Sequence, residues 1–148
     1  LSETIATIAQ NGDEPIDRFM LYYAKHFRES NSQWSQDMFV SWTLGRCTKG
    51  TFLEMGGADG VTHSNTLSLE DHFHWRGTLI EPHPEQYRIL SNTRGNRANR
   101  LMNCAATPAT SEETLELIDA GQLSSLSNYI GRDLHQNNRT NSQRLHSV

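Results

Sequence analysis

Apolar residues recur every three or four positions near the start of the chain. This spacing places them on one side of a helix and predicts an amphipathic helix with a packing face. The members of the stripe are Ile16, Phe19, Met20, Tyr23 and Phe27. The helical pattern spans residues 4–29, and Pro15 is expected to divide it, because proline is tolerated in the first turn of a helix but disrupts its interior. A shorter helix is predicted over residues 37–44.

The middle of the chain alternates short apolar runs with helical patterns. Strands are predicted over residues 51–55, 77–82, 101–106 and 114–118. Of the two helices between the first three strands, one is expected to begin near Ser64 or Asn65, and the other at Pro84. Strands that alternate with helices indicate a parallel sheet. We therefore expect an α/β fold, with a Rossmann-like, doubly wound, mostly parallel sheet over residues 51–148 and an N-terminal helical cap over residues 1–50.

The composition narrows the class of protein. The 148 residues suit one domain, and the remaining apolar pattern, over residues 123–134, predicts only a weak helix. Thirteen Lys and Arg against 17 Asp and Glu give a net charge of −4, which argues against a broad basic surface for nucleic acid. No apolar run approaches the length of a membrane span. Cys47 and Cys104 are too few for a disulfide framework or a zinc site, so reduced thiols and a cytoplasmic location are expected.

The first predicted strand runs into a glycine loop. Glu54, Gly56 and Gly60 form the pattern E-x-G-x-x-x-G, in which glycines let the backbone turn and let a ligand approach closely. Glu81 ends the second predicted strand, where an acid can hold the hydroxyls of a ribose. The loop alone is equally typical of a tight turn, but the loop and Glu81 together favour a ligand site at the carboxyl ends of the strands.

The loop chemistry favours one cofactor over its alternatives. Neither the dinucleotide pattern G-x-G-x-x-G nor the Walker pattern is present, and the loop has no Lys or Arg to meet a phosphate. Its acids, Glu54 and Asp59, suit a ligand with a cationic end. S-adenosylmethionine (SAM) has an ammonium, a sulfonium and a ribose. A nicotinamide-dependent dehydrogenase that uses Glu81 on the ribose is a weaker alternative.

Four segments resemble the FkbM-type methyltransferases, which are class I SAM-dependent enzymes. They are SQWSQD (32–37), FLEMGGADGVTHSNTLSLE (52–70), WRGTLIEPHPEQY (75–87) and NCAA (103–106). The resemblance covers about residues 32 to 135. It implies methyl transfer to a hydroxyl, with a sugar, a glycan or a related natural product as the small-molecule acceptor. The exposed member of Trp34, Trp42 and Trp75 would offer a surface for stacking on a sugar.

The resemblance also implies which residues surround SAM. The methionine part would lie in the loop of Glu54, Gly56, Gly57 and Gly60. Glu81 would hold the ribose diol and Pro82 would shape the loop beside the adenine, which Asn103, Cys104 and Ala105 would flank. Gln36 and Asp37 would close over the methionine end, or instead cap the helix that follows them.

The catalytic step is less well defined by the sequence. Candidates for a general base are Asp59, His63, His83, Asp133 and His135, although a surface or structural role is more typical of each. No metal is expected, because His72 and His74 are two positions apart and do not share a helix face.

The family usually continues with an acid-rich D-x-E-G-x-E segment that is absent here, so we expect the chain to stop inside the methyltransferase domain. This absence favours an alternative function, a noncatalytic SAM-fold module or a fragment of a larger glycan-processing protein.

Overall fold

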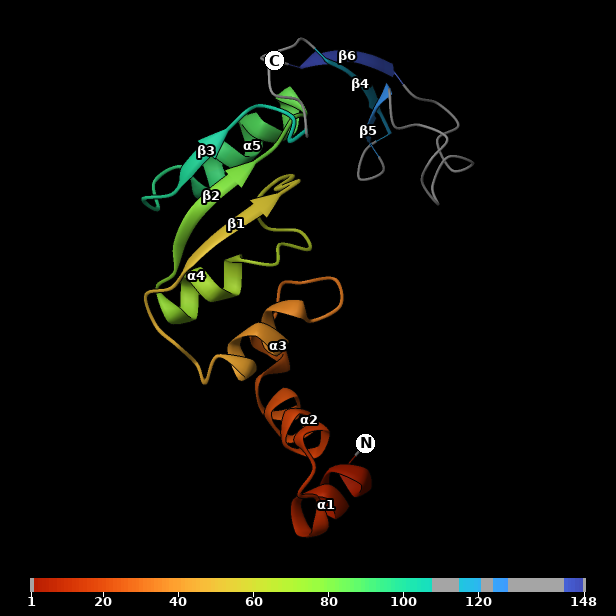
Figure 1. Ribbon diagram of the computed structural model, residues 1–148, viewed down its shortest axis with the longest axis vertical. Coiled ribbons are helices and arrows are strands. Elements are labelled where there is room, and N and C mark those ends of the chain that lie inside the picture. The colour runs from red at the N-terminus through yellow and green to blue at the C-terminus, as the bar shows by residue number, and fades with distance from the viewer. Residues whose placement is uncertain (1, 108–114, 121–123, 128–142, 148) are drawn as a thin grey trace. The chain divides into compact units, whose positions relative to one another are not determined.

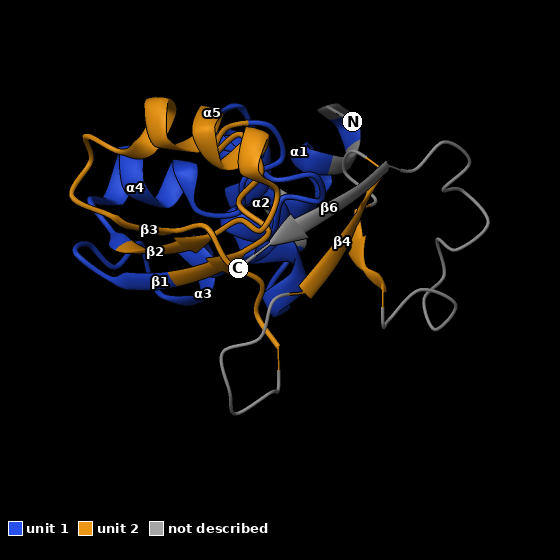
Figure 2. Ribbon diagram, turned by 90° about the horizontal axis from the view of Figure 1, so that it is seen from above, with its two compact units in different colours: residues 1–52, 62–76 blue, residues 53–61, 77–148 orange. Residues whose placement is uncertain are grey.

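The computed structural model describes residues 2–107, 115–120, 124–127 and 143–147 (Figure 1). The chain divides into two compact units (Figure 2). Unit 1 comprises Leu1–Phe52 and Thr62–Arg76, and unit 2 comprises Leu53–Val61 and Gly77–Val148.

Unit 1 contains all of the described helices except α5. These are α1 (Ser2–Asn11), α2 (Pro15–His26), the short 3₁₀ helix η1 (Phe27–Glu29), α3 (Gln36–Thr43) and α4 (Leu67–Phe73). The prediction of two helices divided at Pro15 is confirmed, and Pro15 is the first residue of α2. The apolar stripe of α2 packs on α3, where the Phe19 ring lies 5.6 Å from that of Phe39 and 5.3 Å from that of Trp42. No residue of α2 is fully buried.

The core of unit 1 gathers around α4. Leu69, Phe73 and Trp75 form a buried cluster, against which Val40 and Phe52 pack. The indole Nε1 of Trp75 donates a hydrogen bond of 2.7 Å to the carbonyl of Cys47. The start of α4 lies later than predicted, because Ser64 and the residues after it form a turn in which Ser64 Oγ accepts from the amide of Leu67 (3.2 Å).

A three-stranded parallel sheet joins the first three predicted strand segments, although the third strand ends at Met102 and its predicted extension over residues 103–106 is wrong. Its strands are β1 (Thr51–Met55), β2 (Arg76–Ile80) and β3 (Arg100–Met102), in the order β1-β2-β3. Leu79 of β2 is paired with Leu101 of β3. Helix α5 (Pro84–Arg94) connects these two strands, and Leu79 and Leu90 are buried in unit 2. The molecule therefore has the mixed α/β character that the sequence predicts.

The last strands form a separate antiparallel sheet. The predicted strand near residues 114–118 is confirmed as β4 (Leu115–Asp119), but it pairs with β5 (Ser125–Leu126) and β6 (Gln143–Ser147) in the order β5-β4-β6. Leu117 is buried, and it is paired with Leu126 and Leu145. The weak helix predicted over residues 123–134 is wrong at Ser125–Leu126, since the backbone there pairs with β4; residues 123 and 128–134 lie outside the described part.

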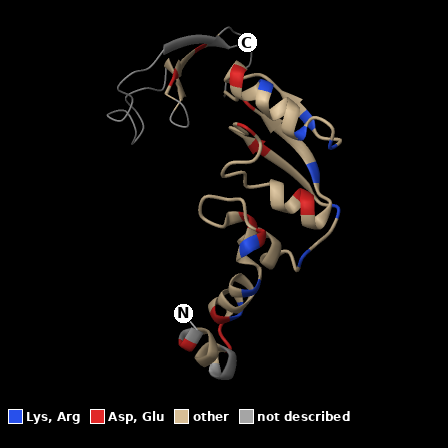
Figure 3. Ribbon diagram, turned by 180° about the vertical axis from the view of Figure 1, so that it is seen from behind, with Lys and Arg blue, Asp and Glu red and all other residues tan. Residues whose placement is uncertain are grey.

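Charged residues of both signs occur in both units. Figure 3 shows acidic and basic positions distributed along the described ribbon. Among the described helices, none is long and apolar enough to cross a membrane.

Candidate functional site

The glycine loop extends β1 along the sheet before it turns away. The amides of Gly56 and Gly57 both donate to the carbonyl of Ile80, at 2.8 and 3.1 Å. The amide of Gly60 then donates to the carbonyl of Gly57 at 2.8 Å and closes a tight turn. Gly56 and Gly60 have φ angles of 76° and 80°, a left-handed conformation that glycine adopts without strain. Glycine therefore occupies the two motif positions at which the backbone is left-handed.

Glu81 joins this loop to the start of α5. Its carboxylate is buried, and its Oε2 accepts a hydrogen bond of 2.8 Å from the amide of Ala58. Its Oε1 accepts one of 2.8 Å from the amide of His83. A carboxylate has about four acceptor positions, so each oxygen can accept a further hydrogen bond. Glu81 thus organises the loop and still has acceptor capacity for a ligand.

Asn103 links the end of β3 to the residues that follow β2. Its side-chain Nδ2 donates to the carbonyl of Glu81 at 2.7 Å and to that of Pro82 at 3.2 Å. Cys104 and Ala105 follow it and are partly buried, as is Pro82. Glu54 is buried in β1. The carboxyl ends of the three parallel strands therefore bring together most of the residues predicted to bind the cofactor.

Two residues that the sequence reasoning missed hold the loop from α5. Arg94 Nη1 donates to the carbonyl of Gly60 at 2.8 Å, and Thr93 Oγ1 donates to that of Asp59 at 2.7 Å. Arg94 is the last residue of α5, and a polar residue there gives no direct indication of a buried contact. The signal was the four-residue spacing from the apolar Leu90, which puts Arg94 on the same helix face.

His83 lies beside the site, but its ring is engaged elsewhere. Its Nδ1 accepts from the amide of Glu85 at 3.2 Å, and its Nε2 lies 3.2 Å from Asp119 Oδ2. Because Nδ1 is an acceptor, the ring proton is assigned to Nε2, which donates to Asp119. His83 therefore ties the start of α5 to β4 and is a poor candidate for a general base.

Gln36 and Asp37 lie in unit 1, at the start of α3. Gln36 Oε1 accepts from the amide of Trp34 at 2.9 Å. The Asp37 carboxylate is buried and accepts from Ser30 Oγ at 2.7 Å and from the amide of Asn31 at 3.0 Å. These contacts hold the turn that precedes α3, whose N-cap residue is Ser35, so the alternative in which the pair caps the helix from outside does not describe them.

The other catalytic candidates are scattered. Asp59 lies in the glycine loop, where its Oδ1 accepts from the amide of Val61 at 2.8 Å. His63 is exposed in unit 1, and its backbone forms an isolated parallel β-bridge with that of Ser32. Asp133 and His135 lie outside the described residues. In the part of the chain that the structure describes, no group of three or more His, Cys, Asp and Glu side chains is placed to hold a metal.

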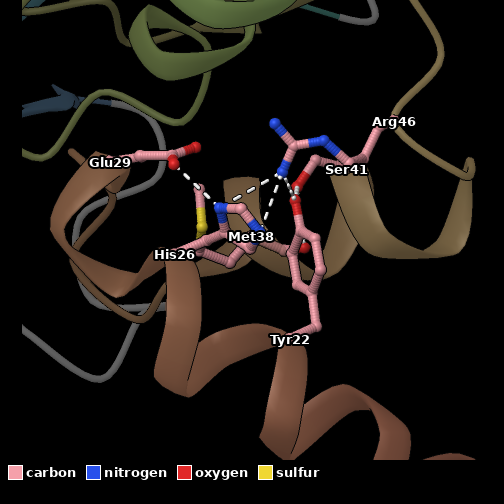
Figure 4. A network of polar contacts seen from close by, with 6 residues as sticks. All are labelled: Tyr22, His26, Glu29, Met38, Ser41 and Arg46. Atoms are coloured by element: carbon pink, nitrogen blue, oxygen red, sulfur yellow. Dashed lines mark hydrogen bonds and ion pairs between the residues drawn. The ribbon is translucent and has the colours of Figure 1, made fainter.

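Unit 1 has a polar network of its own, which no sequence pattern had singled out (Figure 4). Glu29 Oε1 lies 2.8 Å from His26 Nδ1, and Arg46 Nη1 lies 3.2 Å from both ring nitrogens of His26. Tyr22 lies one helical turn before His26, and its hydroxyl bonds Ser41 Oγ at 2.8 Å. The hydrogen bond with His26 lowers the pKa of Glu29. The network connects α2 with α3 and the loop that follows α3.

The end of the parallel sheet thus combines an open glycine loop, a buried carboxylate and an anchoring amide. Its acids, Glu54, Asp59 and Glu81, give it a negative character that suits a ligand with a positive charge and hydroxyl groups. Comparisons of the chain with models of protein families, with curated proteins and with solved structures give no match.

Proposed function

We propose that the chain is a SAM-dependent O-methyltransferase domain of the FkbM type, with a Rossmann-like, doubly wound sheet of which β1, β2 and β3 are a part. The single observation that carries the proposal is the hydrogen bond of 2.8 Å between Glu81 Oε2 and the amide of Ala58. It joins the two sequence features that favour SAM, the glycine loop and the acid at the end of the second strand, in one site.

One position of the site, Gly56, borders open space. A Cβ built on Gly56 would meet no heavy atom within 4 Å, so the space beside this turn is open. Glu81 has acceptor capacity for a ribose diol, and the nearby Glu54 and Asp59 favour a cationic group. The residues present therefore fit SAM better than a pyrophosphate-containing cofactor.

SAM would supply a methyl group activated by its sulfonium. The contribution of the chain is to bind and orient, since transfer in line with the breaking bond depends mainly on positioning. The loop residues would fix the methionine part, Glu81 would fix the ribose, and Asn103 would hold the adenine side through the carbonyls of Glu81 and Pro82. Asp59 is the catalytic candidate that lies in the loop, which makes it the first to test as the acceptor of the hydroxyl proton.

We propose a sugar or glycan hydroxyl as the methyl acceptor. The resemblance to the FkbM-type enzymes supports this choice. Within unit 1, Trp34 is 78% exposed, whereas Trp75 is buried and Trp42 packs on Phe19. A cytoplasmic location, in which Cys47 and Cys104 stay reduced, belongs to the same proposal.

Calorimetric titration with S-adenosylhomocysteine tests the cofactor directly. We expect micromolar binding to the chain and a loss of about tenfold or more in Glu81→Ala, because ribose hydroxyls would lose their acceptor. Glu85→Ala, an exposed acid on α5, is the matched control and should bind normally. No heat with S-adenosylhomocysteine but binding of NAD would favour the dehydrogenase. Binding without transfer to any sugar acceptor would favour the noncatalytic module.

A further inference from the structure

Arg94 is a buried cation in unit 2. It is 0% exposed, and it donates through Nη1 to the carbonyl of Gly60. A guanidinium stays protonated in proteins, and a buried charge is tolerated only where hydrogen bonds compensate for lost hydration. An apolar side chain would fill the same position on α5 without the free-energy cost of desolvating a charge. What distinguishes Arg94 from such a side chain is its hold on the backbone of the loop.

The aliphatic part of the Arg94 side chain occupies the space that a side chain at position 60 would need. A Cβ built on Gly60 would lie 2.7 Å from Arg94 Cγ and 2.6 Å from Leu90 Cδ1. The loop therefore packs at Gly60 directly against side chains of α5. Because the hydrogen bond and the packing act at the same residue, a change at Arg94 is transmitted to the loop.

We propose that Arg94 is a positioning residue of the candidate cofactor site, which it serves by fixing the end of the glycine loop through the carbonyl of Gly60. Thr93 holds the preceding carbonyl, that of Asp59, and Glu81 holds the amide of Ala58. Three successive residues of the loop are thus fixed by separate donors and acceptors. A loop held in this way loses little conformational freedom when a ligand binds, and the affinity is higher for that reason.

This inference rests on the proposed function, and two readouts keep them separate. The first is the affinity for S-adenosylhomocysteine, measured by calorimetry on Arg94→Met, Arg94→Lys and the exposed control Arg88→Met. The second is hydrogen exchange of the loop amides at residues 56–61 without ligand. We expect Arg94→Met to bind about tenfold or more weakly and to exchange faster in the loop, since it loses a charged donor. Arg94→Lys, which keeps a donor, should recover most of both, and Arg88→Met should match the unchanged chain.

Each outcome either supports or overturns the role of Arg94. If Arg94→Met binds and exchanges like the unchanged chain, or if Arg94→Lys recovers neither property, the positioning role is wrong. If the unchanged chain does not bind S-adenosylhomocysteine, the proposed function fails, and loop exchange alone decides the role of Arg94. If Arg94→Met does not fold, Thr93→Val takes its place, because Thr93 is exposed and the change removes the hydroxyl that donates to the carbonyl of Asp59, together with its longer contact of 3.1 Å to the carbonyl of Leu90 within α5. Faster hydrogen exchange of the loop amides in that variant supports the proposal that side chains of α5 hold the loop, and unchanged exchange overturns it.

Discussion

Asp37 Oδ2 accepts a hydrogen bond of 2.7 Å from Ser68 Oγ, although the two residues are 31 positions apart in the chain. Asp37 lies in the first turn of α3, and Ser68 lies in the first turn of α4. Both side chains are buried in unit 1. The carboxylate therefore holds together two helices that the sequence separates by the whole of β1 and the glycine loop.

The stability of unit 1 should fall in acid as Asp37 takes up a proton. Burial alone would raise the pKa of Asp37, but hydrogen bonds hold it below its ordinary value of 3.8; they come from Ser30, Ser68, Asn31 and Ser32. Because the pKa is lower in the folded state, the stabilisation is fully present above about pH 4 and is lost as the pH falls through the folded-state value. Urea unfolding between about pH 2 and 7, followed by tryptophan fluorescence, measures this dependence.

Asp37→Asn is the control for this acid dependence. The amide cannot titrate, so the part of the pH slope due to Asp37 should disappear. Its NH₂ group would replace one of the two oxygens and face either Ser30 Oγ or the pair of Asn31 amide and Ser68 Oγ, and an unsatisfied buried donor costs about 1–3 kcal/mol at neutral pH. An unchanged acid slope in this variant would mean that other carboxylates cause the loss of stability.

Substitution by alanine should reduce stability much more at Gly60 than at Gly57, although both glycines lie in the same loop. Gly60→Ala forces a left-handed alanine, which costs about 1–2 kcal/mol, and overlaps Leu90 and Arg94, which adds about 1–3 kcal/mol. At Gly57 an added Cβ would lie 3.5 Å from Leu79 Cβ, an ordinary contact, and 3.3 Å from Leu90 Cδ2, a tight contact that a small shift of the Leu90 side chain relieves. Gly57→Ala should therefore change the free energy of unfolding by less than about 1 kcal/mol. Chemical denaturation of both variants checks the contrast.

The result would contradict this geometry if both variants lost the same stability, or if Gly57→Ala were the worse of the two. In either case the backbone of residues 57–60 would have to follow another path than the turn closed by the Gly60 amide and the Gly57 carbonyl. Loss of S-adenosylhomocysteine binding in Gly60→Ala alone is the corresponding expectation for the proposed cofactor.

Local patterns predicted the elements that depend on local forces. The stripe from Ile16 to Phe27 predicted α2 because three- and four-residue spacing reports directly on one helix face. The strands β1 and β2 followed from short apolar runs that end in glycine or in an acid. The contact of Glu81 with the loop was also within reach, because the carboxyl ends of adjacent parallel strands lie at one edge of a sheet.

Long-range pairing and polar burial were beyond such patterns. The residues of β4 alternate like any strand, but nothing in them indicates that they pair with β6 rather than with the parallel sheet. The burial of Arg94 depends on the carbonyl of Gly60, which is 34 positions away. Composition likewise does not distinguish the exposed Trp34 from the buried Trp75, since that difference arises from the packing of α4.

Replacing Glu81 by glutamine should loosen the loop without changing the size of the side chain. Glutamine has one oxygen and one NH₂ group, so it can accept from the amide of Ala58 or from that of His83, but its NH₂ group faces the other. We expect a loss of about 1–3 kcal/mol in stability and faster hydrogen exchange at one of these two amides. Equal protection of both amides in Glu81→Gln would contradict the bridging role, and Glu85→Gln, which changes an exposed acid nearby, is the control.

Gly50→Ala should disturb the core of unit 1 through Trp75. A Cβ on Gly50 would overlap the buried indole, whose Nε1 is held by the carbonyl of Cys47. The indole can move away only by weakening that hydrogen bond, so we expect a loss of about 1–3 kcal/mol and a red shift of tryptophan fluorescence. Because the clash is with the larger ring, Gly50→Ala should cost much less when Trp75→Phe is already present. Additive losses in the double variant would show that the two residues do not share this space.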